Sequence, residues 1–222
     1  MVQYSDAILG LIGGPGLSGL TTCGAKELPE ETDYLDAVIW AVIFGATHPD
    51  KAVLHLDITL LRHTNSAVNS YVAGQKHLHH YIEGLVGKQH GLRSYLSASS
   101  AFENCVGSIW KAAEVFDRMK RHVMSEPGTS LTVFTSGSNT DLERVNKINN
   151  TVKHFKPEQA EKSSAPIWIT DRGLESLDAS LDFEELYDNL IALRQVCRTI
   201  FVEIPTEARD LKEKQSKGSI PT

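Results

Sequence analysis

The stretch that decides the fold is LRSYLSASSAFENCVGSIWKAAEVFDRMKRHV, residues 92–123. Its apolar side chains recur at steps of three and four residues, the spacing that places them on one face of an α-helix. Pro127 and Gly128 follow the stretch and end it, because neither residue continues a helix well. The stretch therefore predicts a long amphipathic helix, and its apolar face consists of Leu92, Tyr95, Leu96, Phe102, Val106, Ile109, Trp110, Ala113, Phe116 and Met119.

Two stretches before this helix have the composition of helices as well. The first begins near Pro29, where acidic residues favour a helix N-terminus, and it ends before Pro49. The second follows Asp50, which can cap it, and its apolar residues keep the helical spacing to about residue 86. In this second helix Gly74 is a weak point, and we expect the helix to be broken by the glycines at positions 84, 87 and 91.

Two more helices are expected in the second half of the chain, over 140–155 and 182–203. Thr140 and Glu143 match a capping box, in which the hydroxyl and the carboxylate satisfy free backbone donors at the start of a helix. Asp182 is expected to cap the last helix. Prolines at positions 157 and 205 end the two helices.

Between these two helices the sequence indicates a small β-hairpin. IWIT at 167–170 and LESL at 174–177 are joined by Asp-Arg-Gly, which suits a turn. We therefore predict an all-α fold, an antiparallel helical bundle of four to five long helices with a small β-hairpin near 167–177. We expect three regions along the chain: a glycine-rich N-terminal arm over 1–28, a helical bundle domain over 29–205 and a charged flexible tail over 206–222.

Composition restricts the classes of function. The 222 residues, 41% of them hydrophobic, fit one domain of ordinary size. Three cysteines without a CxxC pair argue against disulfides and a cysteine zinc site, and they favour the reducing cytoplasm. The formal net charge of −6 makes bulk DNA binding unexpected, so any nucleic-acid contact must be local. The apolar run at 34–46 contains Asp36 and is shorter than the roughly 20 residues that span a bilayer, so no membrane contact is expected.

The predicted helix over 140–155, TDLERVNKINNTVKHF, carries the groups best suited to chemistry. At about 100° per residue its apolar residues share one face, and Arg144, Lys147, Asn150, Thr151 and His154 share another. Histidine titrates near neutral pH, a cation can stabilise a phosphate, and an amide can orient a ribose hydroxyl. Such a strip is suited to RNA cleavage by the 2′-hydroxyl without a metal or other cofactor. The simpler interpretation is a polar helix face that only stays hydrated.

The run KINNTVKHF at 147–155 resembles the signature helix of HEPN-domain proteins. The helix SYLSASSAFENCVGSIWKAAEVFDRM at 94–119, with Glu103 in its apolar stripe, is similar to a core helix of such bundles. The closing stretch PIWITDRGLES…LDFEELYDNLIALRQVCRTIF resembles the end of small bacterial proteins with similar bundles. The resemblance covers about residues 92–203.

The resemblance implies a homodimer that brings two motifs together, often as a ribonuclease of a toxin–antitoxin or phage-defence system. The family pattern, an arginine, a polar residue and then a histidine, falls on Asn149, Asn150 and His154. Asparagine cannot supply a permanent charge, so either Lys147 or Arg144 replaces the arginine or the site is degenerate. We favour a degenerate site that contacts RNA or a cognate protein. In an active site, His154 would be the general acid and base, with a cation stabilising the phosphate.

Two alternatives remain open. The chain could be a helical protein-interaction module without catalysis. It could also be a histidine-rich bundle that binds a metal, because His79 and Glu83 are four residues apart and share a helix face, with His77, His80 and His90 nearby. The spacing is not that of an HExxH site, so a solvated polar face is favoured and no metal is assigned.

Overall fold

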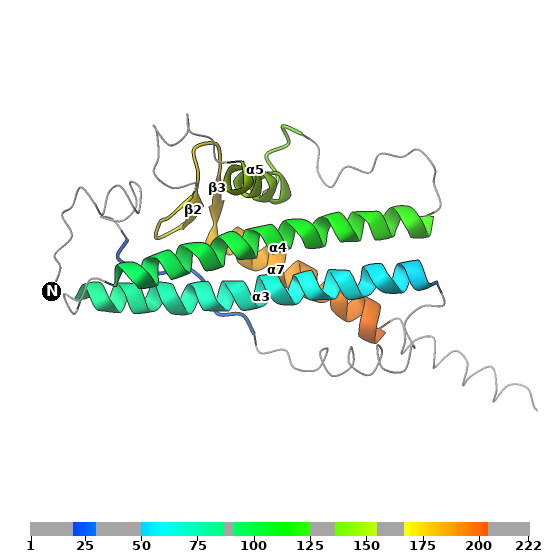
Figure 1. The fold of residues 1–222 in the computed structure, drawn as a ribbon, viewed down its shortest axis with the longest axis horizontal. Helices are drawn as coiled ribbons and strands as arrows, with labels where there is room; N and C mark the ends of the chain where they lie inside the picture. The colour runs from blue at the N-terminus through cyan, green and yellow to red at the C-terminus, as the bar shows by residue number, and fades with distance from the viewer. Residues whose placement is uncertain (1–19, 30–49, 87–90, 125–135, 155–166, 204–222) are drawn as a thin grey trace, which may run out of the picture.

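A computed structural model of the chain describes the residues that are coloured in Figure 1, namely 20–29, 50–86, 91–124, 136–154 and 167–203. This part of the chain is mostly helical and has a small three-stranded antiparallel sheet. A mostly helical class is therefore confirmed. The helix predicted over 29–45, most of the glycine-rich arm and the charged tail lie outside the described residues.

Two long helices form the frame of the molecule. Helix α3, Lys51–Val86, and helix α4, Leu92–Met124, lie side by side and antiparallel (Figure 1). Both match the predicted helices closely, but α3 continues through Gly74 and Gly84. Gly74 is where the ring of Phe102 packs against α3, and an added Cβ would lie 2.9 Å from that ring. The missing side chain thus permits a close approach of the two helices.

Phe102 lies at the centre of the main core. Its ring contacts Tyr71 of α3 in an edge-on arrangement, with the ring centroids 6.0 Å apart, and Phe183 at 5.2 Å. All three side chains are almost fully buried. A second, smaller core cluster that includes Leu60, Met119 and other residues packs α3 and α4 against the end of the last helix.

The short helix α5, Asp141–Lys153, packs on α4 (Figure 1) and confirms the helix predicted over 140–155. The predicted capping box is wrong. Thr140 makes no side-chain capping bond, and Glu143 instead accepts hydrogen bonds from the backbone N–H groups of Gly137 at 2.9 Å and Asn139 at 2.6 Å. Gly137 and Asn139 have φ of 80° and 53°, and this left-handed turn directs their N–H groups back to the first turn of α5.

The sheet has the antiparallel order β1-β2-β3. The predicted hairpin is confirmed, with Leu174 opposite Ile169, and a third strand, which we did not predict, pairs Leu181 with Leu174. Only Leu181 of the third strand is buried, and three residues are too short to show a clear alternation of apolar and polar positions. The strands are β1 Trp168–Ile169, β2 Gly173–Glu175 and β3 Ser180–Asp182.

Helix α7, Phe183–Arg198, follows β3 directly and continues into the π-helical turn η2, Thr199–Glu203. Its predicted start at Asp182 is confirmed, and Glu185 accepts a hydrogen bond from the backbone N–H of Asp182 at 3.0 Å, as in a capping box. The helix contacts both α3 and α4. It therefore connects the two long helices to the sheet.

Residues 20–29 lie against α3 without regular secondary structure. Leu20 and Ala25 are buried and belong to the main core cluster. The carbonyl oxygen of Lys26 accepts hydrogen bonds from the Tyr71 hydroxyl at 3.0 Å and from the Gln75 amide at 2.8 Å. The packed part of the chain thus begins before Pro29.

Within the described residues, no helix is long and apolar enough to cross a membrane.

Candidate functional site

Three of the predicted site residues lie along one strip of α5. Lys147, Asn150 and His154 are three and four residues apart and therefore share a face, which we call the α5 strip. Val145 and Ile148 on the opposite side are fully buried. His154 is exposed at the C-terminal cap of α5, where its backbone N–H donates to the carbonyl oxygen of Asn150 at 2.9 Å. The strip thus projects away from the core.

The side chains of Asn150 and Lys147 both have partners on α5 itself. Asn150 is exposed, and its side-chain amide donates to the Asn146 side-chain oxygen at 3.2 Å. The Lys147 Nζ lies 3.3 Å from the carboxylate of Glu143. The hydrogen bond from the backbone of Gly137 lowers the pKa of Glu143, and those from Asn139 and Lys147 add to the effect. Glu143 is thus a carboxylate that offsets much of the positive charge of Lys147.

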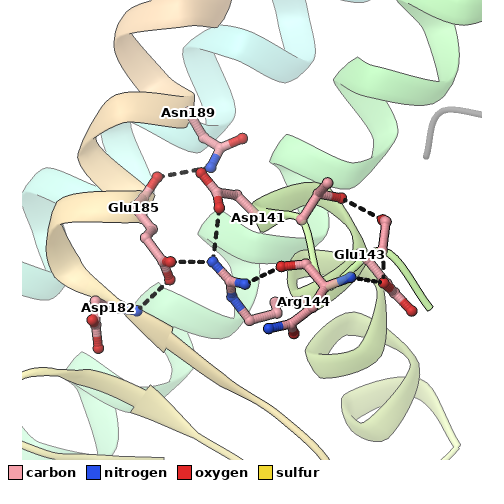
Figure 2. A network of polar contacts seen from close by, with 9 residues as sticks. Asp141, Glu143, Arg144, Asp182, Glu185 and Asn189 are labelled. Carbon is pink, nitrogen blue, oxygen red and sulfur yellow. Dashed lines mark hydrogen bonds and ion pairs between the residues drawn. The ribbon is translucent and has the colours of Figure 1, made fainter. Parts of the chain in front are cut away.

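Arg144, the fourth predicted site residue, belongs to a network between α5 and α7 (Figure 2). Its guanidinium group bonds the Asp141 carboxylate at 2.7 Å, and it also bonds the Glu185 carboxylate and the carbonyl oxygen of Asn139. Arg144 precedes His154 by ten residues, which corresponds to about 15 Å along a helix axis. The structure therefore brings Lys147, Asn150 and His154 together and holds Arg144 elsewhere.

Glu185 is a partner of Arg144 that the sequence does not predict. It caps α7 through the backbone of Asp182, and its own carbonyl oxygen accepts a hydrogen bond from the Asn189 amide at 2.7 Å (Figure 2). Glu185 follows Arg144 by 41 residues, so no local pattern relates the two. The network fixes the start of α5 against the start of α7.

Acidic side chains surround this end of α5. A cavity of about 370 Å³ is lined by three acidic residues, Asp178, Asp182 and Glu185, and by Arg144 and Lys147, which are paired with carboxylates. Carboxylates repel the phosphates of a nucleic acid. Any contact with an anionic polymer must therefore use the other end of the α5 strip, around Asn150 and His154.

Asn149, where the HEPN pattern has its arginine, points into the protein. It is 3% exposed, and its Oδ1 lies 3.5 Å from where a Cβ on Gly107 of α4 would be. Within the described ranges its Nδ2 has no hydrogen-bond partner. The sequence contains a signal for this direction, because Asn149 follows Val145 by four residues and Ile148 by one, within the apolar face.

The histidine cluster lies in the second half of α3. His79, His80 and Glu83 are exposed, and His77 is half-buried. In the part of the chain that the structure describes, no three histidine, cysteine, aspartate or glutamate side chains are placed to share a metal ion. His90, which could have joined the cluster, lies outside that part.

Comparisons with known proteins add no family to this geometry. No protein-family model, no curated protein and no solved structure matches the chain. The functional argument therefore depends on the side chains themselves.

Proposed function

We propose that this chain is a HEPN-like helical protein of the phage-defence or toxin–antitoxin type that contacts RNA through the α5 strip. The observation that carries the proposal is the exposure of the His154 imidazole and the Asn150 amide, one turn apart, on the side of α5 that faces away from the core. The ribonuclease site is degenerate in this proposal. The protein binds RNA and does not cleave it.

The exposed end of the strip has the chemistry for such a contact. An amide can donate to a phosphate oxygen or to a ribose 2′-hydroxyl, and an imidazole can donate or accept a proton near neutral pH. The neighbouring Lys153 is exposed as well and adds a positive charge at the end of the helix. With a net charge of −6 on the whole chain, this contact is local and weakens steeply as salt is added.

The surroundings of the strip argue against cleavage. Stabilising a pentacovalent phosphate requires a positive charge held at the reacting group. The guanidinium group of Arg144 is already bonded to two carboxylates, and the Nζ of Lys147 lies beside that of Glu143. Asn149 is uncharged and buried. Among the described residues of the α5 strip, the cation that shares a face with His154 is thus Lys147, which is paired with Glu143.

The proposal includes a homodimer in the cytoplasm, in which two α5 strips meet at a cleft and RNA lies between them. It also includes an antiparallel bundle of four to five helices, of which α3, α4, α5 and α7 are four. The resemblance to HEPN-domain proteins supports both parts. Sedimentation of the purified protein tests the dimer directly.

RNA binding is tested by the fluorescence anisotropy of a labelled single-stranded RNA at low salt. We expect the double variant with Asn150→Ala and His154→Ala to bind about tenfold more weakly than wild type, because about two hydrogen bonds to the RNA are lost. Lys111→Ala is the matched control, since it changes an exposed residue of α4. Equal affinity of the double variant and this control would remove the α5 strip from the proposal.

Cleavage is tested on the same RNA with wild type and His154→Ala. We expect no cleavage by either protein. Cleavage by wild type that disappears in His154→Ala would show that the site is active, and Lys147 would then be the first candidate for the phosphate-stabilising cation. Cleavage by both proteins at one rate would place the reaction outside the α5 strip.

A second candidate function is a protein-interaction module without RNA. It is favoured by Val72 and Leu96, which are the exposed large hydrophobic residues of the described part, at 48% and 46% exposure. Scattered apolar residues are common on protein surfaces, so this observation is weaker than the first. In this case Leu96→Glu would weaken self-association measured by sedimentation, and the RNA-binding experiment would give no binding by wild type.

A further inference from the structure

A second candidate site lies beside the histidine cluster of α3, because His77, His79, His80 and Glu83 line it. A cavity of about 850 Å³ opens between residues 27–29, α3 and α7. Most of the wall from α3 belongs to one helix face, which carries Val72, Lys76, His79 and Glu83. Leu28, Pro29 and the half-exposed Val72 make part of the lining apolar. A volume in this range is typical of sites for small molecules.

Arg194 of α7 lines this cavity and is only 7% exposed. Within the described part of the chain its guanidinium group makes one hydrogen bond, from Nη1 to the carbonyl oxygen of Pro29 at 2.8 Å, and no ion pair with a carboxylate. Its Nε is buried and has no hydrogen-bond partner among the residues that the structure describes. An arginine so deeply buried is normally paired with an anion, because desolvating an unpaired charge is unfavourable by several kcal/mol.

The rim of the cavity is held in place before any ligand binds. The Gln75 amide donates to the carbonyl oxygens of Ala25 and Lys26, at 3.0 and 2.8 Å. The Lys26 ammonium pairs with Glu184 of α7 at 2.6 Å. These bonds fix the segment at 25–29 against α3 and α7. A ligand that enters the cavity would therefore meet a preformed wall.

The rest of the polar lining carries charges of both signs. Lys76 contributes a second permanent positive charge, and the imidazoles of His77, His79 and His80 can donate hydrogen bonds. Glu27 and Glu83 lie on the same lining and offset the charges of Lys76 and Arg194, so the preference for an anion depends on the burial of Arg194. Arg194 distinguishes the site, because it is buried and pairs with no carboxylate of the described chain.

We infer that this cavity binds a small organic molecule with an oxyanion group, a carboxylate or a phosphate, that pairs with Arg194. The planar guanidinium group matches the two oxygens of such a group. Lys76 reaches the same group from the rim, and the apolar body of the ligand packs on Val72 and Leu28. This site is separate from the α5 strip and does not depend on the RNA proposal.

The inference is tested by the thermal unfolding midpoint of the purified chain, at constant ionic strength, with inorganic phosphate or with hexanoate. A ligand that binds only the folded state raises the midpoint in proportion to its occupancy. Phosphate also stabilises proteins in general, and that effect is the same in every variant. We therefore expect a rise in wild type and in His154→Ala that exceeds the rise in Arg194→Met for at least one probe.

Lys76→Ala keeps the inference testable if Arg194→Met does not fold, because Lys76 is exposed. We expect this variant to bind the effective probe about threefold to fivefold more weakly, as for the loss of one exposed ion pair. A response to hexanoate alone identifies a carboxylate ligand, and a response to phosphate alone identifies a phosphate ligand. Equal rises in wild type, Arg194→Met and Lys76→Ala, or no rise with either probe, would overturn the inference.

Discussion

Arg144 and Arg194 are two largely buried arginines at the two ends of the interface that α7 makes with its neighbours. Arg144 has two carboxylates and a carbonyl oxygen around its guanidinium group, whereas the described residues give Arg194 a single carbonyl oxygen. The first arginine is satisfied by the chain and joins α5 to α7 (Figure 2). The second has bonding capacity that the described chain does not use. The contrast separates a structural arginine from one that is available to a ligand.

The contrast also changes how the α5 strip is interpreted. From sequence, Arg144 was a candidate to replace the arginine missing at position 149. Its two carboxylates, Asp141 and Glu185, make that role unfavourable, because moving the guanidinium group to the strip would leave both carboxylates unpaired. The positive charge that a ribonuclease site requires is thus used to hold two helices together.

The largest expected effect comes from Phe102, whose ring lies between the two regions. It contacts Phe183 at the start of α7 and Tyr71, which holds the rim of the cavity through Lys26. Phe102→Ala should lower the free energy of unfolding by about 3–5 kcal/mol, because it leaves a large void in a closed core. Urea unfolding monitored by circular dichroism measures it. A loss below about 1 kcal/mol would show that the core is not packed as described.

Arg144→Met should have the next largest effect. It leaves the carboxylates of Asp141 and Glu185 without their cation at a junction that is only partly exposed, so we expect a loss of about 2 kcal/mol in the free energy of unfolding. In the background of Glu185→Gln and Asp141→Asn the same substitution should cost less, because the amides need no counter-charge. A cost unchanged by that background would contradict the network in Figure 2.

Arg194→Met should behave in the opposite way. It replaces a buried cation that has no carboxylate partner in the described chain with an apolar side chain of similar length. In the absence of a ligand we therefore expect the free energy of unfolding to stay the same or to rise by about 1 kcal/mol. The same urea titration measures it. A loss as large as that of Arg144→Met would show that both arginines are structural, and the comparison would fail.

The sequence predicted the elements better than the contacts between them. Apolar residues at helical spacing are local signals, so the helices around Phe102 and Leu190 could be located, and Asp182 followed by Glu185 marks the start of α7. The capping box at Thr140 failed because the backbone of Gly137 and Asn139 turns back to Glu143. The capping-box pattern considers the side chains at two positions of the sequence. It does not include the backbone turn before the helix, whose N–H groups bind Glu143 in this protein.

The candidate sites depend on contacts between distant residues. Arg144 and Glu185 are 41 residues apart, and Arg194 and Pro29 are 165 residues apart. Helical geometry alone predicts which residues form the α5 strip. It does not predict that Lys147 and Arg144 are paired with carboxylates. The burial of Arg194 has a signal in the sequence, because Arg194 follows Leu190 by four residues and precedes Cys197 by three, on the apolar face of α7. Its place beside the histidines of α3 has no such signal.

The smallest expected effect concerns Glu143, the carboxylate beside the paired arginine and lysine. Its pKa is lowered in the folded state, first by the backbone N–H of Gly137, so the unfolded chain binds the proton more readily. The stabilisation from Glu143 is therefore complete above the pKa of the unfolded chain and is lost as the pH falls through the lower, folded-state pKa.

Glu143→Gln should reduce this dependence, because an amide cannot take up the proton. We expect the free energy of unfolding of wild type to decrease more steeply than that of the variant between pH 5 and 3, and the two curves to run parallel between pH 6 and 7, where the carboxyl is ionised in both states (about pKa 4.3 in an unfolded chain). Urea titrations at each pH measure both. Parallel curves over the whole range would mean that the turn at Gly137 and Asn139 does not hold the ionised carboxylate, and the junction around Arg144 would then depend on Asp141 and Glu185 alone.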